Sequence, residues 1–174
     1  MVHSLNYASH NLRGPAGSGK SEVCEGLKDK INERKSVDSC FLNLDETKPE
    51  TFRDNLNDVL ECQYVIGEMF SGNGHTTNPK TWINEFKNYK IFSFILKASV
   101  DTCLKRCRND NKKRDRAYQT GDRHDKDHYK FYNCPEFVNF AKNVGIQEET
   151  INTETKSIKE VVEIIYSKIE SFRV

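Results

Sequence analysis

The sequence predicts an α/β fold in which helices cover both faces of a five-stranded parallel sheet. Two observations support this prediction. Short apolar runs alternate with helix-period segments along the 174 residues, which is the order of elements that builds a parallel sheet wrapped by helices. A glycine-rich turn, residues 14–19, also stands directly before an amphipathic segment. The length suits one compact domain and no linker or repeat interrupts it, so residues 1–174 are expected to form a single domain.

Five stretches have the pattern of strands. The first, residues 6–13, is unusual because its only apolar side chains are Tyr7, Ala8 and Leu12, whereas central parallel strands are normally almost continuous apolar runs. Nothing else in the sequence explains its polarity. The other expected strands are residues 40–44, 63–67, 90–96 and, with a weaker pattern, 145–152.

Five segments have the pattern of helices. Residues 19–35 carry apolar side chains at every fourth position, which places them in one buried stripe with charges on the opposite face. The last helix begins after a capping box, in which Ser157 and Glu160 satisfy two free amides of the first turn. The first stripe consists of Val23, Leu27 and Ile31, and the remaining expected helices are 49–62, a segment that begins at Pro79, and 99–114.

Charge, hydropathy and cysteine content limit the classes of partner and compartment. The 27 basic and 26 acidic residues give a net charge of +1, so bulk charge favours neither nucleic acid nor a membrane surface. The most apolar run, residues 91–96, is far shorter than the ~20 residues that span a membrane. Six cysteines without a secretory signal segment predict reduced thiols and a cytoplasmic protein.

The stretch GPAGSGKS, Gly14 to Ser21, has the spacing of a phosphate-binding P-loop. Its glycines let successive backbone amides turn toward phosphate oxygens, and the positive end of the following helix dipole adds to the attraction. Lys20 is then placed to reach the β- and γ-phosphates of ATP, and the Ser21 hydroxyl is placed to ligate Mg²⁺. The expected nucleotide-binding residues are Gly14, Pro15, Ala16, Gly17, Ser18, Gly19, Lys20, Ser21 and Glu22.

The sequence after the loop argues against a GTPase, because two motifs of that class are missing. No glycine after Gly19 has an aspartate three residues before it, so D-x-x-G is missing. Residues 111–114 read NKKR and end in arginine where guanine recognition requires aspartate. The chain is also too short for a large motor ATPase, which leaves a small phosphotransferase.

The chain resembles the P-loop kinases of the nucleotide-kinase type, especially the branch that contains polynucleotide 5′-hydroxyl kinases, zeta-toxin-like kinases and chloramphenicol phosphotransferase. Three landmarks carry the resemblance: GPAGSGKS, the stretch FLNLD ending in Asp45, and KASVDTCLKR at residues 97–106 before a basic loop. The resemblance implies the three-layer P-loop NTPase sandwich, a sheet order of 2-3-1-4-5, and a basic lid at about residues 106–127.

The resemblance also implies roles for three residues. Asp45 is expected to accept a proton from the attacking hydroxyl or to orient Mg²⁺, although a plain helix-capping role also fits it. Glu68, at the end of the third strand, is expected to hold the Mg²⁺ shell or a substrate hydroxyl. Arg106 resembles the first arginine of the lid, which binds ATP phosphates or stacks on adenine.

Two polar segments are expected to serve transfer and acceptor binding. The lid is rich in cations, and one or two of them are expected to close on the transferring phosphoryl group, with Arg114 as our chosen candidate; a solvated charged face is the alternative. The loop 69–78 follows the third strand, so His75 and Thr76 are expected to line the acceptor site or, alternatively, to form turns. The other lid candidates are Arg108, Lys112, Lys113 and Arg116.

Two further patterns have simpler interpretations. The cysteines and histidines at 103, 107, 124 and 128 imitate a zinc site, but Cys103 falls on the face of its helix that is expected to be buried. Residues 129–140 interleave aromatic side chains with Lys130, which is typical either of a single-stranded nucleic-acid surface or of a buried helix face; the buried face is favoured.

Together these observations predict an enzyme that uses ATP and Mg²⁺. It would move the γ-phosphoryl group to a hydroxyl or phosphate of a small molecule, a nucleoside or nucleotide, or a nucleic-acid end. Nucleic acid enters only as such an acceptor, and no membrane partner is expected. The alternatives are a nucleotide-binding regulatory protein that lacks transfer activity and a simple ATPase.

Overall fold

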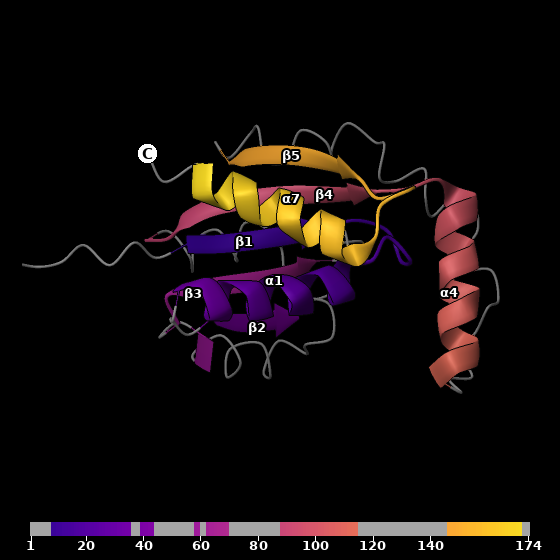
Figure 1. The fold of residues 1–174 in the computed structure, drawn as a ribbon, viewed down its shortest axis with the longest axis horizontal. Helices are drawn as coiled ribbons and strands as arrows, with labels where there is room; N and C mark the ends of the chain where they lie inside the picture. Colours follow the sequence, from indigo (N-terminus) through magenta and orange to yellow (C-terminus); the bar gives the residue numbers. More distant parts are fainter. Residues whose placement is uncertain are drawn as a thin grey trace, which may run out of the picture.

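A computed structural model describes residues 8–35, 39–43, 58–59, 62–69, 88–114 and 146–171. Within these ranges five strands form one sheet in which every pair is parallel, in the order β2-β3-β1-β4-β5 (Figure 1). The fold class and strand order predicted from the sequence are therefore confirmed. The strands are β1 (Ala8–Arg13), β2 (Ser39–Asn43), β3 (Tyr64–Met69), β4 (Lys90–Lys97) and β5 (Gln147–Asn152).

Three of the predicted helices are described: α1 (Lys20–Lys35), α4 (Val100–Arg114) and α7 (Ile158–Ser171). Helices α1 and α7 lie side by side on one face of the sheet, and α4 stands beyond the carboxyl ends of the strands (Figure 1). The helix predicted from Pro79 lies outside the described residues, as does the helix predicted at 49–62 except for residues 58–59, which are helical, and Cys62, which lies in a bend. None of the described helices is long and apolar enough to cross a membrane.

The core lies between the sheet and the pair α1 and α7. The buried stripe predicted for α1 is confirmed, and α7 buries an apolar face that begins after its capping box. Burial of these faces against β1, β3 and β4 supplies the main stabilisation of the fold. The core consists of Leu12, Val23, Cys24, Leu27, Ile31, Tyr64, Ile66, Phe92, Phe94, Leu96, Ile151, Val161, Val162, Ile165 and Ile169.

One polar residue of β1, Arg13, has a structural explanation on the other face of the sheet. Successive residues of a strand point to opposite faces, so Leu12 faces the core and Arg13 faces away from it. Arg13 is only 2% exposed, and its guanidinium pairs with Glu148 of β5, which also accepts a 2.7 Å hydrogen bond from the Ser93 hydroxyl of β4. The charge of Arg13 is therefore neutralised where it is buried in the central strand of the sheet.

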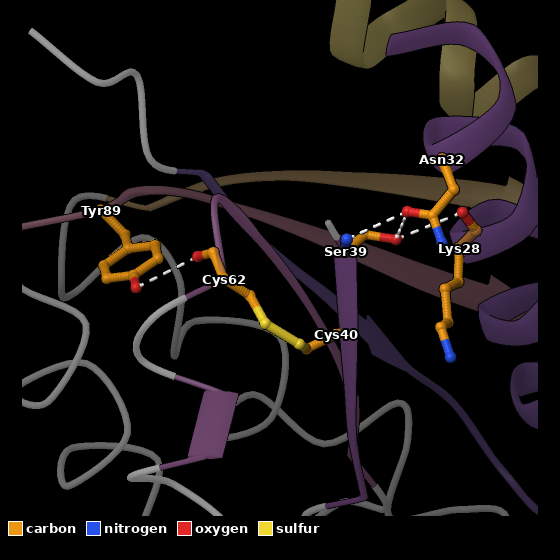
Figure 2. The surroundings of a disulfide bond; sticks show 6 residues. All are labelled: Lys28, Asn32, Ser39, Cys40, Cys62 and Tyr89. Atoms are coloured by element: carbon orange, nitrogen blue, oxygen red, sulfur yellow. Dashed lines mark hydrogen bonds between the residues drawn. A yellow bond between two sulfur atoms is a disulfide. The ribbon is translucent and has the colours of Figure 1, made fainter. Parts of the chain in front are cut away.

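The expectation of reduced thiols is wrong for one cysteine pair. Cys40 of β2 and Cys62, which precedes β3, form a disulfide with their Cα atoms 6.0 Å apart (Figure 2). The two cysteines are 22 residues apart in the sequence, and the parallel pairing of β2 with β3 brings their thiols together. Their spacing in the sequence alone does not reveal this proximity. Among the described residues, Cys24, Cys103 and Cys107 are free, and Cys134 lies outside them.

Hydrogen bonds hold both strands near this disulfide. The Tyr89 hydroxyl donates to the Cys62 carbonyl at 3.4 Å, and Ser39 is bonded to α1 through the Asn32 side chain and the Lys28 carbonyl (Figure 2). The edge strand β2 is thus fixed to α1 at its start and to the segment before β3.

Reduction of the Cys40–Cys62 bond should lower the free energy of unfolding by about 3 kcal/mol, because the bond closes a loop of roughly twenty residues in the unfolded chain. Urea unfolding with and without a phosphine reductant measures this difference. The Cys40→Ser/Cys62→Ser double variant serves as the control and should not respond to the reductant. Equal stability of the wild type under both conditions would contradict the prediction.

Candidate functional site

The glycine-rich loop joins the central strand β1 to α1 at the carboxyl edge of the sheet. Gly14 and Gly17 have φ angles of +152° and +75°, which other residues rarely adopt. Space is also lacking at both positions, because a Cβ atom on Gly17 would lie 2.2 Å from the Cys103 carbonyl oxygen and one on Gly14 would lie 2.5 Å from that of Leu96. The path of the loop against β4 and α4 therefore requires these glycines.

Lys20, the first residue of α1, folds back over this loop. Its side chain is buried, and the ammonium donates to the Pro15 carbonyl at 3.1 Å. The same carbonyl accepts a 3.1 Å hydrogen bond from the Ser18 amide, so the loop curls around one oxygen. The ammonium therefore lies against the loop that leads into α1, and the start of a helix is an end at which an anion is favoured.

A hydroxyl and a carboxylate meet next to the loop. Ser21 donates a 2.9 Å hydrogen bond to Oε1 of Glu68, which is 7% exposed near the end of β3. The pairing of β3 with β1 places Glu68 beside Leu12, two residues before the loop. Two oxygen ligands of this type are suited to Mg²⁺, either directly or through water.

Arg106 lies at a corner formed by α4 and the connection between β5 and α7. Its guanidinium donates to the Thr153 carbonyl at 2.7 Å and makes longer contacts of 3.4 Å with the Thr153 hydroxyl and the Glu154 carbonyl. The Thr153 hydroxyl in turn donates to the Ser18 carbonyl at 3.2 Å. The arginine predicted to begin the lid is therefore linked through one threonine to the glycine-rich loop.

Glu154 is a residue of this corner that sequence reasoning missed. Its carboxylate accepts hydrogen bonds from the Ser99 amide at 2.5 Å, the Ser99 hydroxyl at 2.8 Å and the Thr102 hydroxyl, so it caps the start of α4. The bonds from Thr102 and Ser99 lower the pKa of Glu154 from 4.5 to about 2. The pattern of Ser99 and Thr102 signals a helix start, but it does not reveal a carboxylate from another segment.

Several predicted site residues are not placed by the structure. Asp45, His75 and Thr76 lie outside the described residues, as do residues 115–127 of the lid. The first part of the predicted lid, up to Arg114, continues helix α4.

The zinc alternative gains no support from the described residues. Cys103 is fully buried, as predicted, and burial raises the pKa of its thiol to about 11, which disfavours the thiolate that binds zinc. No group of three or more potential metal-ligating His, Cys, Asp or Glu side chains occurs in the described ranges. The two histidines of the pattern, His124 and His128, lie outside them.

Comparison with solved structures agrees with the fold described above. The chain is similar to shikimate kinase from Acinetobacter baumannii in complex with shikimate, with a TM-score of 0.58 and 17% identity over 97% of this chain and 96% of that one. It has the fold of these kinases. The shikimate kinase from Bacteroides thetaiotaomicron gives a TM-score of 0.54 and 17% identity over 94% of this chain and 98% of that one. No protein-family model and no curated protein sequence matches the chain.

The pKa of Glu154 predicts a specific pH dependence of stability. Because this pKa is depressed in the folded state, the stabilisation is complete above the ordinary value of 4.5 and is lost as the pH falls toward 2. The stability difference between the wild type and Glu154→Gln should be constant from pH 5 to 8 and shrink below pH 4.5, as measured by urea unfolding. Glu33→Gln, at an exposed position of α1, is the control. A difference that stays constant down to pH 2.5 would contradict the assignment.

Proposed function

We propose that the protein is a phosphotransferase that uses ATP and Mg²⁺. The observation that carries the proposal is the Ser21–Glu68 hydrogen bond beside a glycine-rich loop onto which Lys20 folds back. This arrangement brings a glycine-rich loop, a cation and two potential Mg²⁺ ligands next to one another in the fold, although Ser21 and Glu68 are 47 residues apart in the sequence. The similarity to solved kinase structures supports the same class of reaction, although it concerns the fold.

The loop residues would hold the triphosphate of ATP. The backbone from Gly14 to Glu22 would donate its amides, and Lys20 would neutralise charge on the β- and γ-phosphates. A bound phosphate would compete with the Pro15 carbonyl for the Lys20 ammonium, so the bond seen here is one that the ligand replaces.

Ser21 and Glu68 would hold Mg²⁺. The sequence leaves open whether Glu68 serves the metal or a substrate hydroxyl, and its bond to Ser21 favours the metal. The ion, when bound, neutralises the negative charge that develops on the phosphoryl oxygens. The buried position of Glu68 keeps its carboxylate in place beneath the loop.

Arg106 would face the nucleoside rather than the phosphates. Its two terminal nitrogens, Nη1 and Nη2, already donate to Thr153 and Glu154, which leaves the flat face of the guanidinium for stacking on a base. An apolar surface lies close to the loop as well, because Ile158 is 40% exposed and its Cδ1 atom is 3.2 Å from the position of a Cβ atom on Gly19.

The acceptor would bind beyond the carboxyl ends of the strands. Asp45, two residues after the end of β2, is proposed as the group that acts on the acceptor, while His75 and Thr76 are proposed as acceptor contacts. Arg114, the last residue of α4, is proposed to approach the transferring phosphoryl group. The acceptor class is a hydroxyl or phosphate of a small molecule, a nucleoside or nucleotide, or a nucleic-acid end. Because ATP is the proposed donor, the proposal includes a cytoplasmic location.

The test of this function is ADP formation that depends on an acceptor. Purified protein, ATP and Mg²⁺ are mixed with a panel of nucleosides, nucleotides, small alcohols including shikimate, and oligonucleotide 5′ ends. Lys20→Ala should lower turnover with the active acceptor at least about a hundredfold, because it removes the cation beside the phosphates. Lys28→Ala, on the same helix, should not. Binding of ATP without turnover by any acceptor, or full activity of Lys20→Ala, would overturn the proposal.

The metal site has a separate test. Glu68→Gln and Ser21→Ala should each raise the Mg²⁺ concentration needed for half-maximal nucleotide binding by about tenfold, because each removes or neutralises one oxygen ligand. Fluorescence titration with an ATP analogue at a series of Mg²⁺ concentrations measures the shift. Glu25→Gln, at an exposed position of α1, is the control. An unchanged Mg²⁺ requirement in both variants would show that these residues do not hold the metal.

A further inference from the structure

The connection between β5 and α7 is bonded to three other parts of the molecule through Thr153. The Thr153 amide donates to the Lys97 carbonyl at 2.8 Å, and the Thr153 hydroxyl donates to the Ser18 carbonyl at 3.2 Å. The Thr153 carbonyl accepts a hydrogen bond from Arg106 at 2.7 Å. Thr153 is only 3% exposed. One buried residue therefore fixes the spacing between β4, the glycine-rich loop and α4.

The neighbouring residue, Glu154, controls the start of α4. Ser99 caps this helix from within the chain, since its hydroxyl accepts a 3.2 Å hydrogen bond from the Thr102 amide. Glu154, which lies in the β5–α7 connection, adds a second cap. Its carboxylate accepts hydrogen bonds from the amide and hydroxyl of Ser99 and from the hydroxyl of Thr102. Its depressed pKa keeps the carboxylate ionised below the pH at which a glutamate normally becomes protonated, so the cap is charged at neutral and at mildly acidic pH.

The attachment is reciprocal. One turn after Thr102, Arg106 donates back to the carbonyls of Thr153 and Glu154. Between these two contacts lies Cys103, whose carbonyl oxygen approaches Gly17 so closely that no Cβ fits there. Hydrogen bonds to the β5–α7 connection therefore lie on both sides of Cys103, a residue of α4 that contacts the glycine-rich loop.

From this arrangement we infer that Glu154 is a positioning residue, which holds α4 so that Arg106 faces the nucleoside of ATP. The inference rests on the proposed function and deepens it. The triphosphate would be held by the loop and by Lys20, whose bond is to Pro15 within the same loop. Loss of Glu154 should therefore weaken recognition of the base and ribose and leave recognition of the phosphates intact.

Two ligands separate these effects. A non-hydrolysable ATP analogue contains the nucleoside, and inorganic tripolyphosphate does not. With Mg²⁺ present, calorimetry should show that Glu154→Gln lowers the affinity for the analogue about tenfold and changes the affinity for tripolyphosphate less than about twofold. Glu154→Asp should recover part of the loss. Thr102→Val, which removes only one donor to the carboxylate, should show a smaller loss in the same direction and provides a second test if Glu154→Gln folds poorly.

A matched control is available in α7. Glu160 makes the same kind of cap, accepting from the Ser157 amide at 2.8 Å and from the Ser157 hydroxyl at 2.7 Å, and those bonds lie within α7 and its cap rather than on α4. Glu160→Gln should destabilise the protein through the loss of a helix cap, but it should bind both ligands as the wild type does. A merely structural role of Glu154 predicts that the two variants behave alike.

The outcomes are distinct. Unchanged affinity of Glu154→Gln for the ATP analogue would overturn the inference, as would an equal loss for both ligands, since the effect would then act through the glycine-rich loop. Failure of the wild type to bind either ligand would instead overturn the proposed function, and this inference with it. A selective loss for the analogue, absent in Glu160→Gln, supports the inference.

Discussion

The parallel pairing of β1 with both β3 and β4 is the constraint on which the rest of the structure depends. It ends β1 at Arg13, directly before Gly14, in the centre of the carboxyl edge, and it brings Glu68 of β3 within hydrogen-bonding distance of Ser21. The same pairing places the end of β4 against Gly14, so the chain can leave β1 only through a turn without side-chain bulk. The position of the loop, its glycines and its neighbouring carboxylate therefore have one common origin in the sheet.

A second organising feature is the corner where α4, the glycine-rich loop and the β5–α7 connection meet. In Figure 1, α4 stands apart from the layer formed by α1 and α7. Its described attachments are instead polar and local, through Ser99, Thr102 and Arg106 to Thr153 and Glu154. Attachment by directional hydrogen bonds suits an element next to the proposed nucleotide site, which would have to admit and release a ligand.

Local patterns in the sequence were sufficient to predict the strands, their order through the family resemblance, the buried stripe of α1 and the capping box of α7. They also predicted the glycine-rich turn before α1, because eight consecutive residues specify it. The Cys40–Cys62 bond, the Arg13–Glu148 pair and the cap by Glu154 were not predicted. Each joins residues that are far apart in the chain, so their proximity is a product of the sheet topology and has no local signature.

The Arg13–Glu148 pair has a consequence for how this chain can vary. Either residue alone would leave an uncompensated charge under the sheet, where water cannot solvate it, so a single replacement is more harmful than the exchange of both for apolar residues. Substitutions at Arg13 of β1 and at Glu148 of β5 are therefore expected to occur together. Descendants of this sequence should carry either both partners or neither, and grafting the glycine-rich loop with its preceding strand into another sheet would require a recipient that offers the matching carboxylate.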